Sequence, residues 1–366
     1  MLKKLPLLLI FTFWVSACNN SDSDNLDLNF DRSALLINWA DNIIIPAYNS
    51  FKDNLIELQS SSNEFKNNIN ENNLELLREK WIKAYKSWQH IEMFNIGKAE
   101  EIYYASKMNV YPADIIRINS NIESGNYDFN NANNNSAQGF PTLDYLLYFK
   151  ESDGTQVIDK FLSTEGDKHM SYLINVVNQM VINTEIVVND WPTYRDTFVK
   201  STENTATSSV NKLTNDFIFY YEKGLRANKI GIPAGIFSAA PITENVEAYY
   251  NQNISKILIL EAIDAVHNFF LGKAFNSNSK GDSFKTIIET LTNNTESNLG
   301  NIIDNKLSDA KTKINDLNEN FVTQIESDNT TFLRTYDAIQ EVVVLLKVDM
   351  LQVLNINVDY ADADGD

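Results

Sequence analysis

The sequence contains one cysteine, three histidines and seven prolines among 366 residues. A single cysteine cannot form a disulfide within the chain, so no crosslink of that kind supports the fold. The chain has no H-E-x-x-H pattern and no cysteine pair, which are the common zinc-binding spacings. It also lacks the G-x-S-x-G, phosphate-loop and G-x-G-x-x-G patterns. Serine hydrolysis and nucleotide binding therefore have no local signature here.

Positive charge is scarce, because 30 lysines and arginines stand against 49 aspartates and glutamates, for a formal net charge of -19. Such a chain repels phosphate groups, so the composition argues against nucleic acid and anionic membrane surfaces as partners. Hydrophobic residues make up 43% of the sequence, which is enough to build substantial cores. The length predicts two domains of ordinary size.

The N-terminus has the pattern of an export signal. Lys3 and Lys4 precede an apolar run at residues 5–15, which is too short for a permanent membrane span. The following Val15-Ser16-Ala17-Cys18 resembles the lipobox of bacterial lipoproteins. We therefore expect residues 1–18 to be a lipoprotein signal peptide and lipobox, with Cys18 lipidated. The chain is then exported and anchored to the outer membrane, on its periplasmic or cell-surface side. The alternative is a plain secretory signal in which the cysteine is incidental.

The rest of the chain predicts an all-α fold. Residues 19–32 are polar and acidic, which is typical of a flexible tether. Beyond them the apolar spacing is helical, and we expect helices at residues 33–60, 72–96, 140–149, 168–190, 194–228, 245–271, 284–291, 302–325 and 329–354. Residues 97–138 form a long connection, and Trp191-Pro192 is a plausible domain junction. This predicts an N-terminal helical domain over residues 33–192 and a C-terminal four-helix bundle over residues 193–366.

Glu92 breaks the pattern of an aromatic helix. At about 100° per residue, Trp81, Tyr85, Trp88 and Glu92 fall on one stripe. An ionised carboxylate on a buried face is costly unless it is paired. Glu92 is thus either a site residue, or a residue near the helix end that reaches solvent or a basic partner.

Asp144 poses the same question within GFPTLDYLLYF, residues 139–149. A helix here is apolar almost all round, so its one acid needs a partner. Local physics favours a carboxylate in the first helical turn that accepts backbone N–H groups, and Pro141 near the helix start agrees with that reading. The alternative is that Asp144 faces a site.

Taken in order, several short motifs resemble the imelysin-like family. They are the lipobox, the aromatic helix from Trp81 through Glu92 to Gly97, Tyr111-Pro112-Ala113-Asp114, the segment at residues 139–147, residues 229–235 (KIGIPAG) and the closing Asp364-Gly365-Asp366. The resemblance implies two helical bundles with a cleft at their interface. It also implies a link to bacterial iron uptake, although the family carries a peptidase label. The family's hallmark is G-x-H-x-x-E, where this chain has Gly139, Pro141 and Asp144.

Proline cannot ligate a metal or move a proton, so we expect a binding or accessory lipoprotein of iron uptake that is not an enzyme. The alternatives are a metallopeptidase and a structural partner of an outer-membrane iron transporter. The expected cleft residues are Asp144, Glu92, Trp88, Tyr85 and Asp114, together with Gly139 and Pro141. Asp144 and Glu92 are the candidate metal ligands, for iron or another divalent cation.

Overall fold

A computed structural model describes residues 30–149, 156–293 and 295–360, and this part of the chain is all-α, as the sequence predicts. Its only β-type pairing is an isolated bridge between Lys273 and Lys280. The predicted signal segment, Cys18 and most of the predicted tether lie outside the described residues. None of the helices described is both long and apolar enough to cross a bilayer.

The first long helix is continuous but changes its winding. It comprises α1 (Arg32–Ile37), the π-helical η1 (Asn38–Ile44) and α2 (Ile45–Asn67), and the side chain of Asp31 caps its N-terminus. Pro46 lies one turn after Asn42 and has no N–H to donate to the carbonyl of that residue. The carbonyl oxygen of Asn42 instead accepts the N–H of Phe275 at 2.8 Å. A proline near the start of the fold thus makes a backbone acceptor available to a distant segment.

Helix α3 (Glu71–Trp88) packs on α2, and it ends earlier than predicted. Glu92 therefore lies in a turn after the helix and does not extend its aromatic stripe. The connection at residues 97–138 is also more ordered than predicted. It contains four short helices, which are α4 (Lys98–Glu101), α5 (Tyr104–Met108), α6 (Ile115–Ser124) and the 3-10 segment η2 (Ala132–Ala137).

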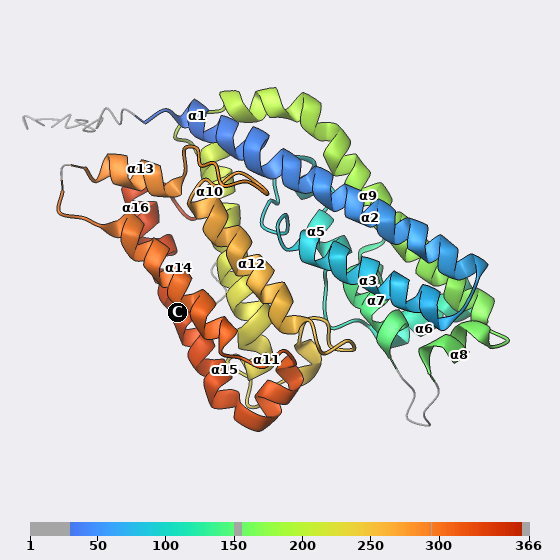
Figure 1. The fold of residues 1–366 in the computed structure, drawn as a ribbon. Helices are drawn as coiled ribbons and strands as arrows, with labels where there is room; N and C mark the ends of the chain where they lie inside the picture. The colour runs from blue at the N-terminus through green and yellow to red at the C-terminus, as the bar shows by residue number, and fades with distance from the viewer. Residues whose placement is uncertain (1–29, 150–155, 294, 361–366) are drawn as a thin grey trace, which may run out of the picture.

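Three further helices complete the N-terminal group: α7 (Gly139–Tyr148), α8 (Val157–Leu162) and α9 (Gly166–Lys200). Helix α9 runs beside α2, as Figure 1 shows for the green and blue ribbons. The predicted break at Trp191-Pro192 is wrong, because α9 continues through Pro192. Trp191 packs on Tyr194 and Phe198 one and two turns along the same helix. Burial of this face outweighs the hydrogen bond that proline removes.

After Lys200 the chain builds a second group of helices. Its members are α10 (Ser209–Phe219), the π-helical η3 (Tyr220–Gly231), α11 (Ile232–Ala234), the 3-10 segment η4 (Thr243–Asn245), α12 (Ser255–Phe270), α13 (Phe284–Leu291), α14 (Leu299–Asn315), α15 (Phe321–Val344), the π-helical η5 (Leu345–Met350) and α16 (Leu351–Leu354). Segment η3 packs on α12 and α15, and α14 packs on the same two helices. This is the neighbour pattern of a four-helix bundle.

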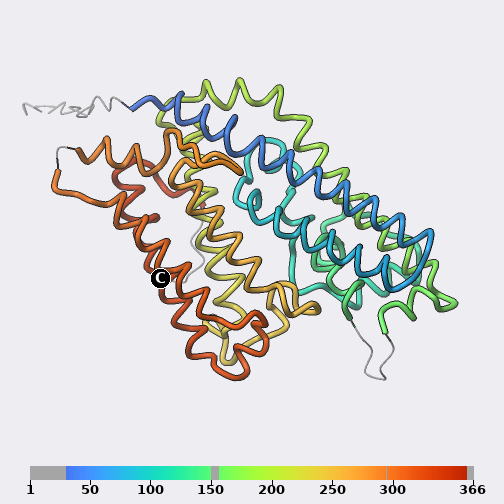
Figure 2. The backbone as a smooth tube through the Cα atoms, viewed as in Figure 1, coloured from blue at the N-terminus to red at the C-terminus, as the bar shows by residue number. Residues whose placement is uncertain are grey.

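Three helices predicted in this half are interrupted, and one of them, expected at residues 302–325, breaks between Asn315 and Phe321. The helix expected at residues 194–228 breaks at residues 201–208, and the one expected at residues 245–271 begins only at Ser255. Figure 2 shows the yellow-to-red group lying beside the blue-to-green group. Contacts between α3 and α12 and between α1 and α10 join the two. The segment before Ser255 also lies between them and builds the site described next.

Candidate functional site

The loop at residues 246–254, between η4 and α12, contacts both groups of helices. Two of its residues, Ala248 (φ 59°) and Gln252 (φ 63°), adopt the left-handed conformation that side chains disfavour. Such strain persists only where surrounding contacts hold the backbone in place. Glu247 and Asp144 make those contacts.

Glu247 belongs to a buried ionic cluster with Lys229 and Glu92. The Lys229 Nζ lies 2.7 Å from Oε2 of Glu247 and 3.4 Å from Oε2 of Glu92. Lys229 and Glu247 are 2% and 3% exposed, and the Glu92 side chain is 13% exposed. Burial opposes the charge on Lys229, but the two carboxylates together hold its pKa above the ordinary value. One ammonium therefore serves two carboxylates, which leaves the cluster with a net negative charge.

Side-chain amides from the N-terminal group complete this cluster. The Asn109 Nδ2 donates to Glu92 at 2.8 Å and to Glu247 at 2.9 Å. Gln89 donates to Glu247 at 3.2 Å. Tyr85 donates to Oδ1 of Asn109 at 2.6 Å and so fixes the orientation of that amide. The carboxylates are thus bound by both halves of the fold.

Three tyrosines surround the cluster, and all remain neutral at ordinary pH. Burial, followed by the charges of Glu247 and Glu92, raises the pKa of Tyr85 and Tyr111 well above the usual range. The same causes raise the pKa of Tyr220, whose hydroxyl donates to Oε2 of Glu92 at 3.1 Å. The hydroxyls of Tyr85 and Tyr220 therefore act as hydrogen-bond donors and not as bases.

The local winding of η3 positions two of these partners. Tyr220 begins this π-helical segment, and Lys229 stands near its end. Pro233 follows one turn after Lys229 and cannot donate to its carbonyl. Gly224 allows the Tyr220 ring to lie close to the backbone, because a Cβ there would be 2.7 Å from a ring carbon. Single-turn π-bulges are frequent at functional sites, and η3 extends this winding over 12 residues.

Asp144 anchors the loop from the other side. Its Oδ2 accepts the N–H of Tyr250 at 2.8 Å, and its Oδ1 accepts the N–H of Asn251 at 3.0 Å. Asp144 is 1% exposed. Burial raises its pKa to about 7, although the two amides act to lower it. The sequence led us to expect that Asp144 accepts hydrogen bonds from backbone N–H groups of its own helix. It does accept backbone N–H groups, but they belong to the distant loop at residues 246–254.

The motif glycine before Asp144 has a steric role. Gly139 has a φ of 74°, and a Cβ there would lie 2.1 Å from the carbonyl oxygen of Met108. Helix α7 can therefore begin against α5 only with glycine at this position. Pro141 follows in the first turn of α7 and is also buried.

Two hollows open near this loop. The Asp144 pocket, of about 320 Å³, is lined by Pro141, Asp144, Tyr111, Tyr250 and neighbouring residues. The Glu92 cleft, of about 370 Å³, is lined by Glu92 and Asn109 and by residues that include Tyr103, Asp216, Phe219, Tyr220 and Asn228. The predicted metal ligands Asp144 and Glu92 therefore line different hollows and do not meet at one site.

The other predicted cleft residues, Trp88, Tyr85 and Asp114, line neither hollow. Trp88 is buried in the core, where it contacts Phe51 and Tyr104. Tyr85 stacks on Phe140 at 4.3 Å between ring centroids, and it reaches the site only through its hydroxyl. Asp114 is exposed, caps α6 through the N–H of Arg117, and lines neither hollow.

The Glu92 cleft contains a further acid, Asp216. Burial, together with the charges of Glu100 and Asp359, raises its pKa to about 8. Asp216 is therefore largely protonated at neutral pH and would release a proton on meeting a cation. Across residues 30–149, 156–293 and 295–360, no group of three or more His, Cys, Asp or Glu side chains is arranged to hold a metal ion.

Comparison with known proteins agrees with this architecture. The family model described as Imelysin, which carries a peptidase label, matches residues 44–348. The chain therefore belongs to the imelysin family. No curated protein sequence matches it.

Two solved structures share the fold. An imelysin-like protein from Psychrobacter arcticum 273-4 superposes with a TM-score of 0.70 at 17% identity, over 90% of this chain and 97% of that one. A putative iron-regulated protein A precursor from Parabacteroides distasonis ATCC 8503 superposes with a TM-score of 0.73 at 16% identity, over 88% and 95% of the two chains. At such identities the likeness establishes the fold alone.

Proposed function

We propose that this chain is a non-enzymatic binding or accessory protein of bacterial iron uptake, and that its ligand enters the Glu92 cleft. One observation carries the proposal: both carboxylate oxygens of Asp144 are used to hold the loop through Tyr250 and Asn251. Pro141 stands where the family motif has histidine. The motif position thus supports the architecture and offers no acid–base pair. The name of the Parabacteroides neighbour supports the link to iron.

The cleft suits an iron complex better than a bare ion. A bare cation needs several protein ligands, and the part of the chain described offers no cluster of three. A chelated ion brings most of its ligands with it. Tyr103 and Phe219, which line the cleft and are 75% and 46% exposed, offer aromatic surface to the body of such a complex. Asp216 offers an oxygen ligand or hydrogen-bond partner to its polar part, beside Glu92, whose two oxygens already accept from Asn109 and Tyr220.

Calorimetric titration with ferric citrate, with haem and with divalent metal ions tests this proposal. We expect one of the iron complexes to bind, and Tyr103→Ala to weaken binding by about tenfold or more, since an aromatic contact is lost. Ile116→Ala is the matched control, because Ile116 is 85% exposed and lines neither hollow. If none of these compounds binds, or if both variants behave as the wild type does, the cleft is not the ligand site.

The peptidase label of the family model favours one alternative, a metallopeptidase. Incubation of the purified chain with an unfolded protein substrate, with and without a chelator, distinguishes the two functions. Cleavage that a chelator stops and that Asp144→Ala abolishes would support the peptidase over the binding protein. Asp53→Ala, at an exposed acid on α2, controls for a general loss of charge.

Anchoring is part of the proposal: Cys18 carries the lipid, and the chain works on the outer membrane beside an iron transporter. Cys18→Ser should release the protein from the membrane fraction into the soluble one. A pull-down of the lipidated protein should recover the transporter. If the Tyr103→Ala variant binds no iron complex but the pull-down still recovers the transporter, the result favours a purely structural partner.

A further inference from the structure

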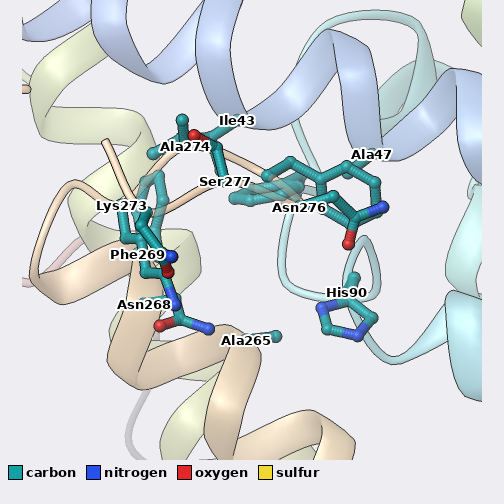
Figure 3. A pocket seen from close by; sticks show the side chains of 13 residues that line it. Ile43, Ala47, His90, Ala265, Asn268, Phe269, Lys273, Ala274, Asn276 and Ser277 are labelled. Carbon is teal, nitrogen blue, oxygen red and sulfur yellow. The ribbon is translucent and has the colours of Figure 1, made fainter. Parts of the chain in front are cut away.

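A third hollow lies away from the site described above, and the proposed function does not use it. This hairpin pocket, of about 400 Å³, is bounded by the end of α12, the segment at residues 272–282, and η1 with the start of α2. Figure 3 shows His90 and Asn276 on one side of it, with Asn268 and Lys273 on the other. Glu92, Asp144 and Glu247 do not line it.

The wall formed by residues 272–282 is fixed to the first long helix. Asn38 donates from Nδ2 to the carbonyl of Gly272 at 3.1 Å and to that of Asp282 at 2.9 Å. Phe275 donates its N–H to the carbonyl of Asn42 that Pro46 leaves available. A Cβ at Gly281 would lie 2.4 Å from the Asn38 amide carbon, so the segment packs closely. This wall of the pocket is therefore fixed to the first long helix by three hydrogen bonds and by close packing.

The charge of the pocket is opposite to that of the chain. No carboxylate lines it, although acids outnumber bases by 49 to 30 in the sequence. Its ionisable lining groups are the Lys273 ammonium and the His90 imidazole. The Nε2 of His90 is held 3.1 Å from Oε2 of Glu261, and that acid also pairs with Lys86 at 2.9 Å. Among the residues that the structure describes, Lys273 has no ion-pair partner.

Hydrogen-bonding groups and aromatic rings complete the lining. The side-chain amides of Asn268 and Asn276 line the pocket, and neither has a hydrogen bond within the part of the chain described. Asn276 has a φ of 50°, in the left-handed region that asparagine adopts readily in turns. Phe94 and Phe275 line the same space, and the Phe275 ring meets His90 edge-on at 5.6 Å between centroids. The pocket thus combines an apolar surface, amide groups and a lysine.

We propose that the hairpin pocket binds a small organic carboxylate with an apolar or aromatic body. The ammonium of Lys273 and the amide of Asn268, which lie on the same side of the pocket, meet the carboxylate, and the phenylalanine rings cover the body. A cationic ligand would meet Lys273 as a like charge. A purely polar ligand would leave the aromatic surface in contact with polar groups.

Calorimetric titration with benzoate, benzyl alcohol and benzylamine tests this assignment, because these three compounds share a ring and differ in charge. We expect benzoate to bind most tightly and benzylamine most weakly. Lys273→Gln should weaken benzoate by about tenfold or more, which is the usual size of a lost charge-assisted hydrogen bond. The same change should remove the preference for benzoate over benzyl alcohol.

Lys280→Gln is the matched control. Lys280 is exposed, stands opposite Lys273 in the β-bridge and does not line the pocket, so benzoate binding should not change. Ala265→Leu, which places a larger side chain in the lining, should abolish binding of benzoate while ferric complexes still bind at the Glu92 cleft. Thermal melting confirms that each variant is folded. The assignment fails if benzoate does not bind at millimolar concentration, if benzylamine binds better, or if the two lysine variants behave alike.

Discussion

The carboxylate of Asp144 accepts the backbone N–H of Tyr250 at 2.8 Å, although 106 residues separate the two in the chain. This contact joins the first turns of α7 to the strained loop that carries Glu247. The acid of the family motif therefore stabilises the loop, and Glu247 of that loop pairs with Lys229. Disturbing either end should affect both the stability of the protein and the Glu92 cleft.

The titration of Asp144 predicts a pH dependence of stability. Its pKa is about 7 in the folded protein, mainly because it is buried, and about 3.9 in an unfolded chain. Between these values the folded state binds more protons, so the free energy of unfolding falls as pH rises and levels off above about pH 7. Relative to Asp144→Asn, the wild type should lose up to about 1.4 kcal/mol per pH unit in this window. Urea unfolding from pH 4 to pH 8 measures the difference.

Asp53→Asn provides the comparison for that experiment, because Asp53 is exposed on α2. Its unfolding curve should run parallel to the wild type across the whole range. If Asp144→Asn also runs parallel, Asp144 does not titrate in this window and the assigned cause is wrong.

Removal of the ammonium of Lys229 should be costly. Lys229→Met leaves Glu247 and Glu92 buried with no cation, and we expect a loss of about 3–5 kcal/mol in the free energy of unfolding. Lys229→Met combined with Glu247→Gln should lose less than the sum of the single changes, because the second change removes one uncompensated charge. Urea unfolding of the four proteins completes this double-mutant cycle. Additive losses would mean that the pair is not coupled.

Gly139→Ala should destabilise the protein more than an ordinary change at a left-handed glycine. The new Cβ would overlap the carbonyl oxygen of Met108, and φ is unfavourable as well. Gly125→Ala measures the cost of the unfavourable φ alone, because Gly125 has a φ of 63° and no atom lies within 4 Å of a Cβ placed there. We expect about 1 kcal/mol for Gly125→Ala and at least about 2 kcal/mol more for Gly139→Ala. Equal losses in thermal melting would contradict the steric argument.

Asn38→Ala should loosen the wall of the hairpin pocket. It removes the donor shared by the carbonyls of Gly272 and Asp282, at a cost of about 1–3 kcal/mol. Lys273 and Lys280 lie within this segment, so trypsin should cut there faster than in the wild type. Asn63→Ala removes an exposed bond within α2 and should leave the cleavage rate unchanged. A rate unchanged in both variants would show that Asn38 does not hold the segment.

The sequence predicted the class of the fold because helical spacing of apolar residues reports burial directly. It failed where burial and local rules oppose each other. Pro192 suggested a break, yet the faces of Trp191 and Phe198 are buried deeply enough for α9 to continue. Glu92 belongs to the ionic cluster, but its helical angle is not the reason, because α3 ends at Trp88 and Glu92 lies in the following turn.

The two residues central to the cluster, Lys229 and Glu247, were not predicted as site residues. Glu247 was assigned to the start of a helix, whereas it lies in a loop whose conformation depends on Asp144. Lys229 belongs to the KIGIPAG motif at residues 229–235. A charged residue directly before the apolar stretch at residues 230–236 was the sequence feature that could have indicated a buried ion pair. Pairing across 18 or more residues of chain depends on tertiary contacts that spacing does not encode.

The continuity of α9 bears on how this protein can be divided. A cut after Pro192, where the sequence suggested a junction, would bisect a 35-residue helix and separate Trp191 from Phe198. It would also detach Arg195, whose guanidinium binds both oxygens of Asp41 at 2.6 Å. A fragment that ends after Lys200 keeps these contacts, but it lacks Lys229 and leaves Glu92 without its cation. Fragments meant for separate expression should therefore be tested as a complementing pair rather than singly.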